Sequence, residues 1–398
     1  MEWKLIRLDE FCDSVRDGTH DTPKPTEKGY PLVTSKAIRR GKVYLDECYL
    51  ISQKDFDKIN KRSLVERWDV LMTMIGTVGR LLLVKDKPDY AIKNIALFKI
   101  GNELKAKWLY YYLKMSSVQN YFEMIANGTS QHFIGLGHMR KLKIPDVTVS
   151  SMKITSILST YDSLIENNTK RIRFLEKMAE NLYKEWFVRF RFPGHEKVEM
   201  ENGLPKGWKI KRIKDYGRIE TGKTPSMQVP EYYGGKYLFI KTPDMHGGVF
   251  VCSTEETLSE LGNKTQPKKL LPPLSVMVSC IGSAGIVALN AKSAHTNQQI
   301  NSIIPSDIAN IEWLYFTCKD LKSTIELFGA TGATMTNLSK GKFEKLKVLE
   351  PPITLRSVFH EKVSSMFKLI LKLEYKNTLL ARQRDLLLPR LMSGKLEV

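Results

Sequence analysis

The second half of this 398-residue chain repeats motifs of the first half in the same order. Four pairs of matching segments are separated by offsets of 204 to 206 residues. The pairs are 3–8 with 208–213, 74–80 with 280–286, 128–131 with 332–335, and 142–144 with 346–348. A shared order at a nearly constant offset indicates a duplicated unit, whereas one weak match would carry little weight.

Both copies have the same plan. Short apolar runs between Gly and Pro residues come first and predict strands and loops, as at residues 30–34 and 237–241. A long stretch without Gly or Pro follows in each copy and predicts a helix. We therefore expect an α+β chain in which two similar mixed α/β domains are separated by two long helices, with a pseudo-two-fold internal repeat. The expected boundaries are 1–149 and 192–350 for the two domains, and 150–191 and 351–398 for the two helices.

Apolar residues alternate spacings of three and four along both predicted helices, which is the heptad pattern of a coiled coil. An antiparallel pair would let each domain cap one end of the coil. Pairing the two seams in reverse order sets Ile154 against Leu391, Leu158 against Leu387, and Asn168 against Asn377. A matched pair of buried Asn residues costs stability but specifies register. The seam positions are Ile154, Leu158, Tyr161, Ile165, Asn168, Ile172, Leu175, Ala179, Leu182 and Trp186, and Phe359, Val363, Met366, Ile370, Leu373, Asn377, Leu380, Arg384, Leu387 and Leu391.

The first seam covers roughly 48 Å of helix at about 1.5 Å per residue, so the coil would act as a ruler between the domains. Pro389 precedes the last seam position, and we expect the second helix to kink or stop there.

The charge balance favours a polyanionic partner. The chain has 62 Lys and Arg against 43 Asp and Glu, a net charge of +19, and the excess occurs in both domains and both helices. A distributed excess suits a polyanion lying along the molecule, because neutralised phosphates release condensed counterions. The five cysteines are scattered, which argues against a disulfide framework and against a zinc site. The chain begins without an apolar signal core and has no apolar run long enough to span a membrane, so we expect a cytoplasmic protein.

Residues 217–224 fit the phosphate-binding loop pattern letter for letter. Their context is poor for that role. Pro225 removes an amide from the helix that would have to follow, Glu220 would repel a phosphate, and residues 209–216 are too charged for a buried parallel strand. We find no fingerprint for a dinucleotide or methyl-donor cofactor, and the seven histidines lack zinc-ligand spacing. We therefore expect no catalytic residue, no cofactor and no metal.

The residues that match a known family are the duplicated unit, the Leu204–Trp208 opening of the second domain, residues 221–225, Gly282–Gly285 followed by Asn297–Gln299, and residues 383–395. Together they resemble the specificity subunit of type I restriction–modification enzymes over nearly the whole chain. The first domain departs from the family pattern, because it lacks the Leu-Pro-x-Gly-Trp opening.

The resemblance implies a non-catalytic subunit whose two target-recognition domains each read one half of a bipartite sequence in double-stranded DNA. It implies further that the helices bind two modification subunits, which methylate adenine, and that restriction subunits join the complex.

Reading bases requires polar side chains on loops, with basic residues on phosphates. The candidates in the first domain are Thr34, Ser35, Lys36, Arg39, Arg40, Thr129, Ser130 and Gln131. Those in the second domain are Lys223, Lys241, Thr242, Asp244, Thr334 and Met335. For any single position, an ordinary turn or a solvated charge is an equal alternative.

Two other classes of function stay open at this level. A coiled-coil scaffold that does not read DNA has the same helices and would show no salt-sensitive DNA affinity. A P-loop nucleotide-binding enzyme would require Lys223 to bind phosphate.

Overall fold

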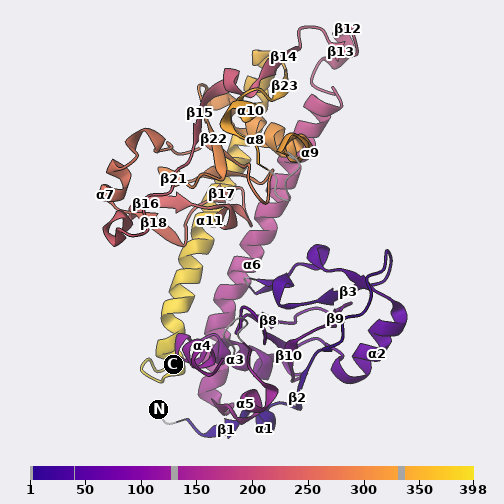
Figure 1. Ribbon diagram of the computed structural model, residues 1–398, viewed down its shortest axis with the longest axis vertical. Helices are drawn as coiled ribbons and strands as arrows, with labels where there is room; N and C mark the ends of the chain where they lie inside the picture. Colours follow the sequence, from indigo (N-terminus) through magenta and orange to yellow (C-terminus); the bar gives the residue numbers. More distant parts are fainter. Residues whose placement is uncertain (1–2, 40, 127–132, 330–336) are drawn as a thin grey trace. The chain divides into compact units, whose positions relative to one another are not determined.

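The computed structural model describes residues 3–39, 41–126, 133–329 and 337–398 (Figure 1). Its contacts divide the chain into two compact units. Unit 1 is Met1–Ser163 with Ala381–Val398, and unit 2 is Leu164–Leu380. Each unit therefore combines one α/β half of the chain with a stretch of both long helices.

Unit 1 is built on a four-stranded antiparallel sheet in the order β2-β10-β7-β8. A smaller sheet has the order β6-β3-β9, and β1 pairs with β11 and β4 with β5. The strands are β1 (Leu5–Arg7), β2 (Ser14–Asp17), β3 (Tyr30–Val33), β4 (Ile38–Arg39), β5 (Lys42–Val43), β6 (Leu50–Ile51), β7 (Val70–Thr73), β8 (Leu81–Leu83), β9 (Ala91–Ile92), β10 (Ile95–Lys99) and β11 (Lys143–Pro145). The helices are α1 (Leu8–Phe11), α2 (Gln53–Ser63), α3 (Glu103–Leu113), α4 (Ser116–Ile125) and α5 (Leu136–Lys141).

The central strands of unit 1 are apolar on both faces, so both faces must be covered. Val70 and Met72 share a core with Trp108 of α3. Leu71, which lies between them, belongs to a second core with Val33 of β3. The alternation of side chains along a strand thus packs helices against one face of the sheet and the smaller sheet against the other.

Unit 2 has a main sheet in the order β15-β22-β19-β20-β17 and a smaller sheet in the order β18-β16-β21. Its strands are β12 (Met200–Glu201), β13 (Leu204–Pro205), β14 (Lys209–Arg212), β15 (Gly217–Thr221), β16 (Tyr233–Ile240), β17 (Phe250–Val251), β18 (Glu256–Leu258), β19 (Val276–Ser279), β20 (Val287–Asn290), β21 (Ala294–Thr296), β22 (Ile300–Pro305) and β23 (Lys347–Glu350). Its short helices are α7 (Glu260–Lys264), α8 (Ile311–Asp320), α9 (Lys322–Gly329) and α10 (Lys340–Glu344). The first four strands of this main sheet occupy the same order as the four of unit 1, and β14 pairs with β23 as β1 pairs with β11. The chain is therefore mixed α/β with two units of like topology, and the strands expected near residues 30–34 and 237–241 are present as β3 and β16.

The two long helices are α6 (Val149–Tyr183), which continues into a π-helical turn at Lys184–Val188, and α11 (Ile353–Met392). All the seam positions predicted from the heptad spacing are buried or half-buried. In unit 2, Asn168 is hydrogen-bonded to Asn377, and the ring of Tyr183 lies 6.4 Å from that of Phe359. These two contacts run in opposite order along α6 and α11, so the helices are antiparallel there (Figure 1).

The part of α6 and α11 that belongs to unit 1 joins that unit's own core. Ile154 and Leu158 share the core with Leu388, Leu391 and Met392. The second helix does not stop at Pro389 but continues to Met392. Pro389 lacks only the amide hydrogen that would bond to the carbonyl four residues earlier, and the carbonyls of Pro389, Arg390 and Leu391 accept amides from within residues 393–396, so the last turn forms past the proline. Within the described residues, none of the helices combines the length and apolar character that crossing a membrane requires.

Candidate nucleic-acid interface

The segment after β3 carries four of the described candidates in unit 1. It forms a short 3-10 turn at Ser35–Ala37 and then enters β4. Ala37 and Ile38 are buried and anchor the segment, whereas the side chain of Lys36 is exposed. The apolar residues thus hold the polar ones at the surface, as a loop that reads DNA requires.

Arg39 is engaged within the protein. Its guanidinium forms an ion pair with Glu47 and lies 4.5 Å from the centroid of the Tyr44 ring. The two charged side chains are 38% and 45% exposed, and an ion pair with so much exposure to water contributes little stability. Arg39 could therefore exchange Glu47 for a phosphate at small cost.

The corresponding segment of unit 2 begins where β16 ends and turns at Thr242–Met245. Asp244 shapes this turn, because its Oδ2 accepts a hydrogen bond from the amide of Lys241 at 2.9 Å. The ammonium of Lys241 pairs with Glu256, and Thr242 is buried with its hydroxyl 3.4 Å from Oε1 of Gln299. The structure brings these three candidates together and gives each a partner inside the unit.

Six candidates lie outside the described residues. They are Arg40, Thr129, Ser130, Gln131, Thr334 and Met335.

The phosphate-loop pattern at residues 217–224 does not have the fold that nucleotide binding needs. Its first five residues form β15, which pairs antiparallel with β22, and a loop that ends in the short turn Pro230–Tyr232 follows instead of a helix. Gly222 is required by packing, because a Cβ there would lie 2.2 Å from the carbonyl oxygens of Thr296 and Asn297. The exposed side chain of Lys223 has no ion-pair partner among the described residues. The pattern thus arises from an antiparallel strand and a close backbone contact.

The loop that follows β15 is held by residues that are not among our DNA-binding candidates. Thr224 Oγ1 donates to Oε1 of Gln298 at 2.7 Å. The matching positions of unit 1, at an offset of 204, are His20 and Asn94, and the Nδ1 of His20 lies 2.7 Å from Oδ1 of Asn94. In each unit, therefore, polar side chains connect the loop after β2 or β15 to the turn before the neighbouring strand of the main sheet, β10 or β22. Subtracting the repeat offset of 204 from positions 224 and 298 gives positions 20 and 94, so the repeat in the sequence could have identified the second pair from the first.

A buried histidine, His295, lies in β21 of the smaller sheet of unit 2. His295 Nε2 is 2.9 Å from Oδ1 of Asn263, and burial lowers the pKa of His295 to about 4. A neutral imidazole with an amide partner supports the smaller sheet and carries no charge toward DNA. Among the described residues, no three His, Cys, Asp or Glu side chains are gathered closely enough to hold a metal ion.

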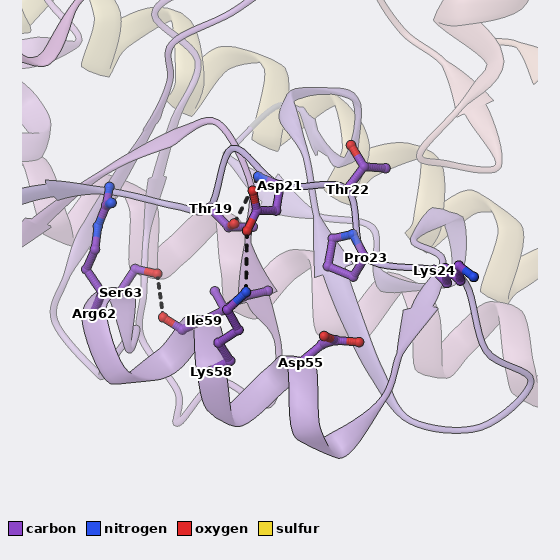
Figure 2. A pocket seen from close by; sticks show the side chains of 10 residues that line it. All are labelled: Thr19, Asp21, Thr22, Pro23, Lys24, Asp55, Lys58, Ile59, Arg62 and Ser63. Carbon is purple, nitrogen blue, oxygen red and sulfur yellow. Dashed lines mark hydrogen bonds and ion pairs between the residues drawn. The ribbon is translucent and has the colours of Figure 1, made fainter.

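A polar cavity of about 480 Å³ lies in unit 1, between the loop after β2 and helix α2 (Figure 2). Gly18 starts that loop, and a Cβ there would lie 2.3 Å from the carbonyl oxygen of Ile92, so the loop leaves the sheet directly beside β9. The lining residues are Thr19, Asp21, Thr22, Pro23, Lys24, Asp55, Lys58, Ile59, Arg62 and Ser63. Cations, carboxylates and hydroxyls thus line one hollow, a mixture suited to phosphates and base edges together.

Comparison with known proteins assigns the family. The family model for the type I restriction modification DNA specificity domain matches residues 1–177 and again residues 205–379. The chain is 32% identical to the type I restriction enzyme HindI specificity subunit of Haemophilus influenzae, over 88% of this chain and 91% of that protein. It is 27% identical to the type I restriction enzyme MjaIX specificity subunit of Methanocaldococcus jannaschii, over 83% of this chain and 78% of that protein.

A solved S subunit of a type I restriction–modification system from M. genitalium has a similar fold. The TM-score is 0.53 at 18% identity, over 98% of this chain and 96% of that one. The two family matches divide this chain into two copies of one DNA specificity domain. The chain belongs to the family of type I restriction–modification DNA specificity proteins.

Proposed function

We propose that this chain is the DNA specificity subunit of a type I restriction–modification enzyme and that each of its two domains reads one half of a bipartite target in double-stranded DNA. The observation that carries this proposal is the duplication itself. One chain contains two matches to a DNA specificity domain and two sheets with a shared strand order. Two related readers in one chain suit a target with two specific halves, and a net charge of +19 suits a polyanion.

The chain supplies recognition, and the chemistry belongs to its partners. We propose that two modification subunits, which methylate adenine, bind the helical regions and that restriction subunits join them. Exposed apolar side chains on α6 support a docking role for that helix, since Phe174 is 71% exposed and Met178, one turn later, 55%. Apolar side chains left open on a long helix are typical of a surface that a partner covers.

We further propose that residues 150–191 and 351–398 serve as helical spacers between recognition domains at 1–149 and 192–350. In this proposal α6 and α11 pair along their whole seam as an antiparallel coiled coil, and a pseudo-two-fold axis relates the two halves of the chain. The Asn168–Asn377 pair in unit 2 and the helical residues in the core of unit 1 support it.

The test uses the chain purified together with its modification subunits. The complex is incubated with duplexes of random sequence, and bound DNA is sequenced at increasing salt concentrations. We expect enrichment of two short specified segments separated by a gap of fixed length without sequence preference. The modification subunits alone serve as the control. Binding without any enriched sequence, or without salt dependence, would support a coiled-coil scaffold instead.

A further inference from the structure

The cavity of unit 1 has the chemistry of a site that holds DNA by its backbone and reads a base at the same time (Figure 2). We propose that this cavity is where unit 1 contacts its half of the target. In it Lys24 and Lys58 bind backbone phosphates, and Asp21 accepts a hydrogen bond from the amino group of a cytosine or an adenine. This inference rests on the proposed function and assigns residues to it.

The walls of the cavity are held in place before any ligand arrives. Thr19 donates its amide to the carbonyl oxygen of Ile92 at 3.0 Å and accepts the amide of Asn94 on its own carbonyl at 3.1 Å. Its hydroxyl oxygen accepts the amide of Asp21 at 3.1 Å. The loop is thereby tied to β9 and to the turn after it, so binding would cost little ordering of the chain.

The opposite wall, helix α2, is also fixed. Ser52 caps the helix by accepting the amide of Asp55 at 3.1 Å. Phe56 stacks on Tyr30 of β3 with ring centroids 4.0 Å apart, and Ile59 is buried. The apolar side of α2 thus packs against the rest of unit 1, and Lys58 lies on the side that lines the cavity.

The cationic side chains of the lining differ in how free they are. Arg62 is paired with Asp17, a carboxylate only 11% exposed, which also lies 2.9 Å from Nε2 of His20. Arg62 therefore serves to hold the wall. Lys58 lies 3.6 Å from Asp21 with both side chains about three-quarters exposed, at 73% and 75%. An ion pair so open to water is weak, so a phosphate could take Lys58 and leave the Asp21 carboxylate to a base.

The mixture of charges distinguishes DNA from a small anion. Asp21 and Asp55 would repel a small anion that fills the cavity, whereas a DNA strand can meet Lys24 and Lys58 with its phosphates and present a base edge to a carboxylate. A base edge presents amino donors that a carboxylate accepts, and Asp pairs with the amino group of cytosine in the major groove. Thr22 accepts a hydrogen bond from Lys93, so its own hydroxyl proton is free to be donated to a ligand.

The first test concerns the phosphates. The double variant Lys24→Ala/Lys58→Ala is assembled with the modification subunits, and affinity for the selected target is measured at several salt concentrations. We expect affinity to fall about tenfold and the salt dependence to become shallower, by about 0.9 in the logarithmic slope for each phosphate that is no longer neutralised. The matched control is Lys54→Ala/Lys61→Ala, which removes two exposed cations of α2 that do not line the cavity. Equal reductions in both double variants would overturn the assignment.

The second test concerns the base. In the Asp21→Asn variant, sequence selection is repeated, and we expect an altered preference at one position in one half of the target. The other half is an internal control and stays unchanged. An unchanged sequence in both halves, or changes in both, would contradict the role of Asp21. Because Asp21 is exposed, its replacement leaves the core of unit 1 intact.

The outcomes separate the two levels of the proposal. If the unaltered complex selects no bipartite sequence, the proposed function fails. If it does, and the cavity variants behave as the unaltered complex, only the cavity assignment fails. Titration with inorganic phosphate tests whether the cavity binds a small anion instead of DNA. If the cavity variants lose phosphate binding but keep DNA affinity and sequence preference, the cavity is a small-anion site and the proposal is overturned.

Discussion

Asn168 and Asn377 meet in the helical part of unit 2, where Nδ2 of Asn168 donates to Oδ1 of Asn377 at 2.9 Å. Asn168 is only 5% exposed, and the Nδ2 of Asn377 in turn lies 3.4 Å from the hydroxyl of Thr169. The two amides are therefore joined by one hydrogen bond, and Thr169 accepts from Asn377, within a seam whose other members are mostly apolar. Any shift of one helix along the other would leave a buried amide without its partner, which penalises other registers.

This pairing predicts a non-additive response to mutation. Asn377→Leu leaves the buried amide of Asn168 unpaired and should lower the free energy of unfolding by about 1–3 kcal/mol. The double variant Asn168→Leu/Asn377→Leu should recover much of that stability, because an apolar pair suits the seam. A double-mutant cycle from urea unfolding measures the coupling between the two positions. Leu379→Ala, on the exposed side of α11, is the control, and simple additivity would show that the pair does not couple.

Glu374 on α11 predicts a pH dependence of stability. Its Oε1 and Oε2 accept the amides of Val249 and Phe250 at 2.8 and 2.9 Å, and burial raises the pKa of Glu374 to about 8 despite these two donors. The folded state thus binds a proton more tightly than the unfolded state, in which the pKa is near 4.5. The free energy of unfolding should therefore fall as pH rises from about 4.5 to about 8.

Glu374→Gln should remove this part of the pH dependence, because the amide does not ionise. It also supplies one acceptor oxygen for two amides, which lowers stability by an amount that does not depend on pH. The variant should therefore fall furthest below the unaltered chain at low pH, and the difference should narrow as pH rises. Urea unfolding from about pH 5 to about pH 8.5 compares it with Glu361→Gln, which alters an exposed carboxylate of the same helix. The same slope in the Glu374→Gln variant and in the unaltered chain would exclude Glu374 as the source.

Close packing at Gly222 predicts that even one methyl group is harmful there. Gly222→Ala would press a Cβ against the backbone of Thr296 and Asn297, and we expect stability to fall by roughly 1–3 kcal/mol or more. Gly341→Ala is the matched control, because no atom lies within 4 Å of its Cβ and alanine favours the helix α10 by about 0.5–1 kcal/mol. Thermal unfolding measures both, and equal stabilities would contradict the tight contact.

Arg39 and its neighbour Arg40 provide a prediction about DNA affinity. Replacing both with Ala should weaken DNA binding and flatten its salt dependence, since each phosphate contact contributes to the slope. Glu47→Gln should act in the opposite direction, because it frees the Arg39 guanidinium from its ion pair. Binding of the selected target at several salt concentrations measures both variants. An unchanged slope in the double Ala variant would show that these arginines do not contact phosphates.

Much of the architecture could be predicted from the residues in order. The repeated motifs indicated two like halves, and the heptad spacing selected seam positions that are all buried or half-buried in the structure. These features are local or periodic, so they appear in the sequence directly. When the seam of the second helix is read in reverse order, the same spacing places Asn377 opposite Asn168, and these two residues are hydrogen-bonded in unit 2.

The tertiary structure decided what periodicity does not encode. It showed that Gly222 serves a backbone contact and belongs to no nucleotide loop, and that Asp244 and Thr242 have partners inside unit 2. It also assembled the cavity of unit 1 from a loop at 19–24 and a helix at 53–63, two separate segments that neither charge nor spacing connects. The physical reason is that a side chain's partners depend on which strands lie next to each other in the sheets, and adjacency between distant segments is a property of the folded chain alone.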